Sequence, residues 1–210
     1  MAPEERAGSM KKLWKFQEAF SILPSGWLTE AEAAELWTAS LCTGDILEIG
    51  TYRGRSATLL ACSLARHNYV GITPTLTLCD SYDDGHHFGG GDELTPEQAI
   101  DSVIEGLRLS GIDMQFVDLA RMSEQELSAK WPADKKLGLL YMDGDHSFEG
   151  TFGVIERWYR RVYQHGRMLF HDYADAGGGL EVKRAVELGC ERGWIELLKV
   201  TERMAVCRCL

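Results

Sequence analysis

The sequence predicts a doubly wound α/β domain, in which a mostly parallel sheet carries helices on both faces. Short apolar runs alternate with longer stretches of helix-forming residues, as they do where parallel strands are joined by right-handed helical crossovers. With 210 residues, of which 45% are hydrophobic, the chain can bury the core of one domain. We expect residues 41–210 to form this domain and residues 1–40 to form a helical lid or interface segment.

Two helices are expected before the first strand. Apolar side chains recur at helical spacing over residues 10–22, which predicts an amphipathic helix that docks as a lid or an interface. After a turn at Pro24, Thr29 and Glu32 have the spacing of a capping box. They predict the start of a second helix that continues to Leu41.

Five short apolar or β-rich runs are expected to form the parallel part of the sheet. Each has the length of a buried strand and ends at a polar or turn residue. They lie at residues 45–49, 75–79, 114–117, 137–142 and 167–170. The second of these strands is predicted to end at Asp80 and the third at Asp118.

Helices are expected between these strands, and a hairpin is expected at the C-terminus. The helices are predicted at residues 56–66 and 96–109, through 152–159, and at 180–191. Two further β-like runs, 195–200 and 204–209, are separated by only three residues. Because parallel strands need a crossover of about a dozen residues, these two strands must pair antiparallel.

The charge distribution narrows the range of partners. The formal net charge is −10, and between Arg66 and Arg108 eight acidic residues occur without any Lys or Arg. Because nucleic-acid binding depends on clustered Lys and Arg, the sequence favours a small-molecule substrate and no nucleic acid. The chain has no apolar run of about 18 residues and no apolar signal-peptide core, so we expect a cytoplasmic protein that does not bind a membrane.

Two glycines in the loop after the first strand indicate a ligand-binding turn. Gly50 allows a sharp exit from the strand, and Gly54 lets the backbone approach a ligand closely. The spacing is G-x-x-x-G rather than the G-x-G-x-x-G that holds the pyrophosphate of a dinucleotide. The loop therefore argues against a nicotinamide cofactor.

Acidic side chains at successive strand ends suggest what this ligand is. Glu48 is suited to a cationic amino-acid group and poorly suited to a diphosphate. Asp80 can accept two hydroxyl hydrogen bonds from a ribose, and Asp118, beside Leu119, can orient an adenine amine. The three carboxylates together predict a nucleoside that carries an amino-acid moiety.

Three segments, DILEIGTYRGRS (45–56), MDGDHSFEG (142–150) and FHDY (170–173), resemble class I S-adenosylmethionine-dependent methyltransferases. The similarity is strongest to small-molecule O-methyltransferases and to cephalosporin-hydroxylase-like proteins, and it covers about residues 40–190. The resemblance implies a Rossmann-like, seven-stranded sheet whose last strand is antiparallel. It also implies that residues 41–210 form a methyltransferase domain with S-adenosyl-L-methionine as cofactor.

The cofactor-binding residues expected from the strand ends and from this resemblance lie in the loops after the first four strands. They are Glu48, Gly50, Thr51, Tyr52, Gly54, Ser56, Asp80, Asp118, Leu119 and Asp143.

A second group of polar residues is expected at the ends of the fourth and fifth strands. Asp143 closes the fourth strand, and His171 and Asp172 close the fifth. If these strands are neighbours, their ends lie about 5 Å apart, and the three side chains can bind a divalent metal. Related O-methyltransferases place a carboxylate where this chain has His171, which favours Mn²⁺, Fe²⁺ or Zn²⁺ over Mg²⁺, or no metal at all.

The turn after the fourth strand contains the candidate catalytic base. His146 stands where some similar sugar O-methyltransferases carry their base, and an imidazole can take a hydroxyl proton near neutral pH. Asp145 is the rival base. In the alternative interpretation Asp143, Asp145 and His146 form a structural turn, with Asp145 or Ser147 capping the next helix.

The favoured function is methyl transfer from S-adenosylmethionine to a hydroxyl of a sugar, polyketide or phenol. An N-methyltransferase acting on a small amine, a nicotinamide-dependent oxidoreductase and a non-catalytic cofactor-binding module remain alternatives. A homodimer formed through the N-terminal helix is a further possibility.

Overall fold

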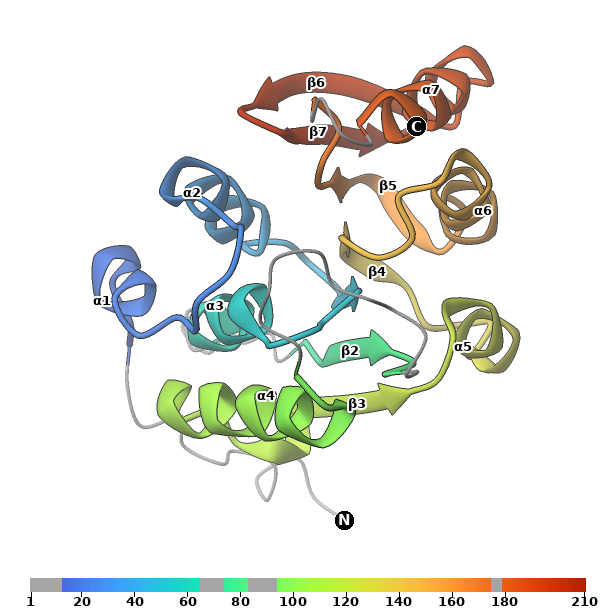
Figure 1. Ribbon diagram of the computed structural model, residues 1–210. Helices are drawn as coiled ribbons and strands as arrows, with labels where there is room; N and C mark the ends of the chain where they lie inside the picture. The colour runs from blue at the N-terminus through green and yellow to red at the C-terminus, as the bar shows by residue number, and fades with distance from the viewer. Residues whose placement is uncertain (1–12, 65–73, 83–93, 175–178) are drawn as a thin grey trace.

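The computed structural model describes residues 13–64, 74–82, 94–174 and 179–210. They form an α/β domain around one seven-stranded sheet, with the strand order β3-β2-β1-β4-β5-β7-β6 (Figure 1). The strands are β1 Asp45–Ile49, β2 Leu76–Asp80, β3 Val117–Arg121, β4 Leu137–Met142, β5 Val162–Phe170, β6 Ile195–Thr201 and β7 Met204–Cys209. The first five pair in parallel, whereas β7 is antiparallel to both β5 and β6. The predicted fold class and the C-terminal hairpin are confirmed.

Helices cover both faces of the sheet (Figure 1). They are α1 Phe16–Phe20, α2 Glu30–Ala39, α3 Arg55–Leu64, α4 Pro96–Ser110, α5 Glu124–Lys130, α6 Phe148–Trp158 and α7 Gly179–Glu191. Helices α1 to α4 pack their apolar side chains on one face, and α5 to α7 pack on the other. The chain runs outward from β1 through β2 to β3 and then returns to place β4 on the other side of β1. Ligands of open α/β sheets bind at such a reversal, outside the carboxyl ends of the strands.

The N-terminal segment belongs to the core of one face. Thr29 caps α2 and forms the predicted capping box with Glu32. Ala33 and Leu36 of this helix are fully buried in the cluster that also contains side chains of α3. Helix α1 is shorter than the predicted 10–22, since Ser21 ends it shortly before Pro24; residues 10–12 lie outside the described residues.

The predicted third strand is wrong in its position. Asp113 accepts a hydrogen bond from the backbone N–H of Gln115 and thereby caps a short 3₁₀ helix, Met114–Phe116, where the strand was expected. Strand β3 follows this turn, so Asp118 pairs with Thr77 in the middle of an edge strand instead of ending it. The difference matters for function because the loop after β3 begins four residues later in the chain than predicted.

Helix α5 was not predicted. Its N-terminus is a capping box in which Ser123 and Glu126 exchange backbone and side-chain hydrogen bonds. The S-x-x-E pattern before Leu127 is a known start signal for a helix and was available in the sequence.

Among the residues that the structure describes, no helix combines the length and the hydropathy needed to cross a membrane.

Candidate functional site

A cavity of about 720 Å³ opens at the carboxyl ends of the central strands. This volume falls in the range of pockets that enclose a small organic ligand. Its walls come from seven parts of the chain: residues 25–28, the loop after β1, the end of β2, the end of β3, the β4–α6 segment, the end of β5, and Arg203. The cavity therefore lies where the strand order reverses, as expected for a doubly wound sheet.

Close backbone packing requires both glycines of the loop after β1. Gly50 has φ +86°, and a Cβ atom there would lie 2.1 Å from the carbonyl oxygen of Asp143. Gly54 has φ +81°, and its Cβ would lie 2.9 Å from the Cα of Val103 on α4. Gly50 lines the cavity, whereas Gly54 allows the approach of a helix and not, as predicted, of a ligand.

Glu48 is completely buried directly behind this loop. One of its carboxylate oxygens accepts a hydrogen bond from the Ser56 hydroxyl, and Ser56 lines the cavity. The other oxygen, Oε2, has no hydrogen-bond partner among the described residues, and the same holds for the buried Thr51 hydroxyl at the cavity wall. Burial raises the pKa of Glu48 well above its usual value. The Thr51 hydroxyl lines the cavity and suits a ligand that brings a hydrogen-bond donor, whereas Glu48 does not itself line the cavity and borders it through Ser56.

Asp80 ends β2 and holds the loop in place. Its two carboxylate oxygens accept the backbone N–H groups of Tyr52 and Tyr82, each at 2.9 Å. Tyr52 has φ +45°, a left-handed conformation that a non-glycine residue adopts only when its surroundings stabilise it. Each oxygen keeps a lone pair, so Asp80, which lines the cavity, can still accept hydroxyl groups.

The residues after β3 differ from those predicted. Asp118 is exposed within the edge strand, and neither it nor Leu119 lines the cavity. Met122, Ser123 and Glu124 take their place at the cavity wall. Glu124 is nearly buried and is held by the Arg157 guanidinium and by the indole N–H of the neighbouring tryptophan on α6.

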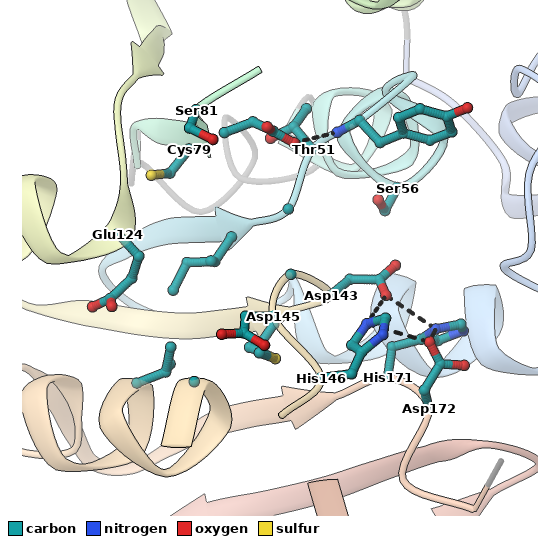
Figure 2. A pocket seen from close by; sticks show the side chains of 18 of the residues that line it. Thr51, Ser56, Cys79, Ser81, Glu124, Asp143, Asp145, His146, His171 and Asp172 are labelled. Atoms are coloured by element: carbon teal, nitrogen blue, oxygen red, sulfur yellow. Dashed lines mark hydrogen bonds and ion pairs between the residues drawn. The ribbon is translucent and has the colours of Figure 1, made fainter. Parts of the chain in front are cut away.

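The predicted cluster at the ends of β4 and β5 is present (Figure 2). Met142 and Phe170 are paired at the strand ends, so the residues that follow them come together. His171 Nδ1 lies 3.2 Å from Asp143 Oδ1 and 3.2 Å from Asp172 Oδ2.

His146 completes the cluster from the turn after β4. Its Nε2 lies 3.5 Å from Asp143 Oδ1 and 3.4 Å from Asp172 Oδ2. This nitrogen and Nδ1 of His171 are both buried and lack a hydrogen-bond partner among the described residues. Two carboxylate oxygens and two nitrogens are thus directed toward one small volume (Figure 2).

The electrostatics of the cluster follow from this crowding. Burial would raise the pKa of Asp143, but contact with His146 and His171 lowers it to about 2. The pKa of His146 is raised by contact with Asp143 and by the charge of Asp172. Burial disfavours a charge on His171, yet its contacts with Asp143, Asp172 and Glu32 raise its pKa.

The cluster has a donor set that suits a divalent cation. Asp143, His146 and Asp172 each offer one ligand atom, and these atoms lie within 4.8 Å of one another. Around an octahedral ion with bonds of about 2.1 Å, adjacent ligand atoms are about 3 Å apart, and His146 Nε2 lies 3.5 Å and 3.4 Å from the two carboxylate oxygens. The trio differs from the predicted one in a single member, with His146 in place of His171; both histidines border the cavity, and His171 is the more deeply buried of the two.

Asp145, the rival base, points away from the cluster (Figure 2). Its Oδ1 accepts the backbone N–H of Ser147, and its backbone oxygen accepts the Thr151 hydroxyl at 3.2 Å. Ser147 in turn caps α6. Asp145 therefore serves the start of this helix, as the alternative interpretation of the turn expected, although it also borders the cavity.

Comparisons with known proteins agree with this geometry. A family model described as a methyltransferase domain matches residues 47–173. The O-methyltransferase TomG from Streptomyces achromogenes, solved with S-adenosylmethionine, is 16% identical and has a TM-score of 0.65 over 100% of this chain and 99% of that one. The TDP-rhamnose 3′-O-methyltransferase CalS11 is 16% identical, with a TM-score of 0.63 over 99% of this chain and 95% of that one. At these identities the likeness shows the fold.

One curated relative is the uncharacterized protein R132 of Acanthamoeba polyphaga mimivirus. It is 25% identical over 140 residues, which are 67% of this chain and 56% of that protein, so the chain spans about half the length of the curated relative it matches. Because the methyltransferase-domain model matches more than half of the chain, and the fold is that of its structural neighbours, the chain belongs to the class I S-adenosylmethionine-dependent methyltransferases.

Proposed function

We propose that this chain transfers the methyl group of S-adenosylmethionine to a hydroxyl group of a small molecule. The observation that carries the proposal is the position of Asp143, His146 and Asp172, which face the same cavity as the glycine loop after β1. One wall of the cavity has the features of a cofactor site, and the other has the groups needed to activate an acceptor.

The cofactor would be held by the loop after β1 and by Asp80. Thr51 and Ser56 offer hydroxyl groups, Glu48 a buried carboxylate behind them, and Asp80 two acceptor oxygens for a ribose. When bound, S-adenosylmethionine supplies the electrophilic methyl group. The chain then contributes chiefly proximity and alignment, which can account for much of the rate of a displacement reaction.

Acceptor activation is assigned to the cluster. Asp143 and Asp172 would hold a divalent cation, which when bound lowers the pKa of an acceptor hydroxyl. His146 would take the hydroxyl proton on Nε2. A single nitrogen lone pair cannot bind a metal and accept a proton at once, so this proposal leaves the metal to the two carboxylates, a donor set that Mg²⁺ commonly uses together with water and substrate oxygens.

The nature of the acceptor is proposed from the cavity and from the structural neighbours. CalS11 acts on TDP-rhamnose, and TomG is involved in tomaymycin synthesis. The described cavity has room for a cofactor and a compact acceptor, and its walls offer no large basic surface for a nucleic acid. A hydroxylated sugar, polyketide or phenol fits these conditions.

Calorimetry tests the cofactor assignment. S-adenosylhomocysteine should bind and NADH should not; tight binding of NADH without a response to S-adenosylhomocysteine would contradict the proposal. A panel of hydroxylated and amine-bearing natural products, assayed for S-adenosylhomocysteine release, then identifies the acceptor. Methylation of amines alone would replace the hydroxyl assignment by N-methylation.

Metal removal tests the cation. Treatment with a chelator should abolish turnover on the acceptor found in the panel, and Mg²⁺ or Mn²⁺ should restore it. Full activity in the presence of the chelator would remove the metal from the proposal and leave His146 as the activating group.

Sedimentation velocity tests the homodimer expected through the N-terminal helix.

A further inference from the structure

A buried carboxylate from the N-terminal segment lies beneath the cluster. Glu32 is on α2, is fully buried, and its Oε2 lies 3.3 Å from His171 Nε2. A capping-box glutamate usually reaches back to its own helix N-terminus at the protein surface. Glu32 does this through Thr29, at 3.0 Å, but the same carboxylate also contacts a residue 139 positions away in the sequence. Its role therefore extends beyond starting a helix.

The contact orients the His171 ring. Because Nε2 is engaged by Glu32, Nδ1 is directed to Asp143 and Asp172, at 3.2 Å from an oxygen of each. In metal sites, an outer carboxylate commonly orients a histidine that binds the metal. Here the histidine that Glu32 orients contacts the two carboxylates assigned to the metal instead. Glu32 can thus influence both carboxylates of the cluster without touching either.

A second connection runs from Glu32 to the wall of the cavity. Its Oε1 accepts the backbone N–H of Arg203, in the turn between β6 and β7, at 3.0 Å. The guanidinium of Arg203 donates to Asp172 Oδ1 at 3.1 Å and to the backbone oxygen of Trp27 at 2.8 Å. Trp27 and Arg203 both line the cavity. Glu32 therefore lies where the N-terminal wall, the hairpin turn and the cluster meet.

We propose that Glu32 is a positioning residue for the Asp143–His146–Asp172 cluster, which acts by holding His171 and by fixing the turn that carries Arg203. This inference rests on the proposed function, since it concerns the groups assigned there to acceptor activation. It also gives helix α2 a part in the site beyond covering it.

The test is the Glu32→Gln variant, with the affinity for Mn²⁺ measured by electron paramagnetic resonance. The carboxylate accepts from three donors, on Thr29, Arg203 and His171, whereas an amide offers one oxygen and turns an NH₂ group toward a donor. Loss of an outer partner typically weakens metal binding about 10–100-fold, and we expect this loss here. The affinity for S-adenosylhomocysteine should stay unchanged, because the hydrogen bonds of Glu32 go to Thr29, His171 and Arg203 and not to the loop after β1.

Glu35→Gln is the matched control. Glu35 lies on the same helix and bonds Lys199 and Thr201 of β6, away from the cluster. The Glu35→Gln variant should bind Mn²⁺ with the same affinity as the unmodified protein. Equal Mn²⁺ affinities for the Glu32 and Glu35 variants would overturn the proposal, as would a parallel loss of S-adenosylhomocysteine binding in the Glu32 variant.

A measurement on the unmodified protein covers a Glu32 variant that does not fold. With ¹⁵N-labelled histidine, the His171 ring should show a protonated Nε2 that exchanges slowly with water, as a buried donor to Glu32 must; the signal is assigned by its absence from His171→Asn. An Nε2 without a proton would overturn the proposal. If the unmodified protein binds no Mn²⁺, the metal part of the proposed function fails, and this ring signal alone decides the role of Glu32.

Discussion

The loop after β1 and the cluster after β4 and β5 face each other across one cavity but are built differently. The loop is shaped by backbone: two glycines with positive φ and one carboxylate, Asp80, that receives two N–H groups. The cluster is made of charged side chains, and its partners come from α2, the two strand ends and the β6–β7 turn. Substitutions in the loop should therefore act through steric conflict with neighbouring backbone. Substitutions in the cluster should act through the loss of a charge or of a side-chain orientation.

The largest effect is expected on the cluster side. His146→Ala should lower turnover about 10²–10⁴-fold, the usual contribution of a general base, while S-adenosylhomocysteine binds as before. The acceptor found in the panel provides the assay. Unchanged Mn²⁺ affinity in this variant supports the base assignment, whereas a loss of Mn²⁺ would make His146 a ligand. If Asp145→Asn lost turnover to this extent and His146→Ala did not, the catalytic base would be Asp145.

On the loop side, Gly50→Ala should destabilise the fold by about 2–4 kcal/mol, because a Cβ would enter the backbone of Asp143 and the residue would keep a strained φ. Denaturant unfolding measures this. Gly111→Ala is the control, since Gly111 also has a positive φ, +71°, but nothing lies within 4 Å of its Cβ position. It should cost only about 1–2 kcal/mol. Equal losses of unfolding free energy in the two variants would show that the close packing of Gly50 against Asp143 does not contribute to the effect of Gly50→Ala.

A smaller effect is expected for Asp80, the carboxylate that we propose binds the ribose. Asp80→Asn leaves one acceptor oxygen in place of two. The binding free energy of S-adenosylhomocysteine should therefore weaken by the contribution of one hydrogen bond to a charged group, about 1.5–3 kcal/mol. Asp118→Asn serves as its control and should bind like the unmodified protein, because Asp118 lies outside the cavity. Weaker binding of S-adenosylhomocysteine to the Asp118 variant would support the contact with adenine that the sequence predicted for Asp118.

The smallest effect concerns pH and Glu48. Burial raises the pKa of Glu48 in the folded protein, so folding favours the protonated carboxyl. The resulting stability is fully present below the unfolded pKa, about 4.3, and is lost as the pH rises through the folded pKa. Between pH 5 and pH 8 the Tm without ligand should therefore fall more in the unmodified protein than in Glu48→Gln. Parallel Tm curves for the two proteins would show that Glu48 does not titrate in this way.

The sequence was sufficient wherever a local pattern determines local structure. The apolar run of β4, the Thr29–Glu32 capping box and the alternation of strands and helices act over a few residues, and each was found where it was expected. The meeting of Asp143 with His171 and Asp172 also followed, because the ends of neighbouring parallel strands must coincide.

Errors arose where two local patterns compete. Residues 114–117 have the β propensity of a strand, but the Asp113 side chain caps a turn there first, which shifts β3 and removes Asp118 from the cavity. The capping box of α5 was present in the sequence and would have placed Met122 to Glu124 at the cavity wall. In both places a capping side chain, Asp113 or Ser123, determines the local structure over the strand propensity of its neighbours.

What the sequence by itself determined is thus the sheet, the glycine loop after β1 and the residues at the ends of β1, β2, β4 and β5, since these depend on short-range propensity and on the periodicity of burial. Only the tertiary structure decided that Glu32 lies beneath His171, that Arg203 reaches both Asp172 and Trp27, and that Gly54 makes room for α4. These contacts join residues that are at least 31 positions apart in the sequence, and which donors a buried carboxylate meets depends on how the helices pack on the sheet.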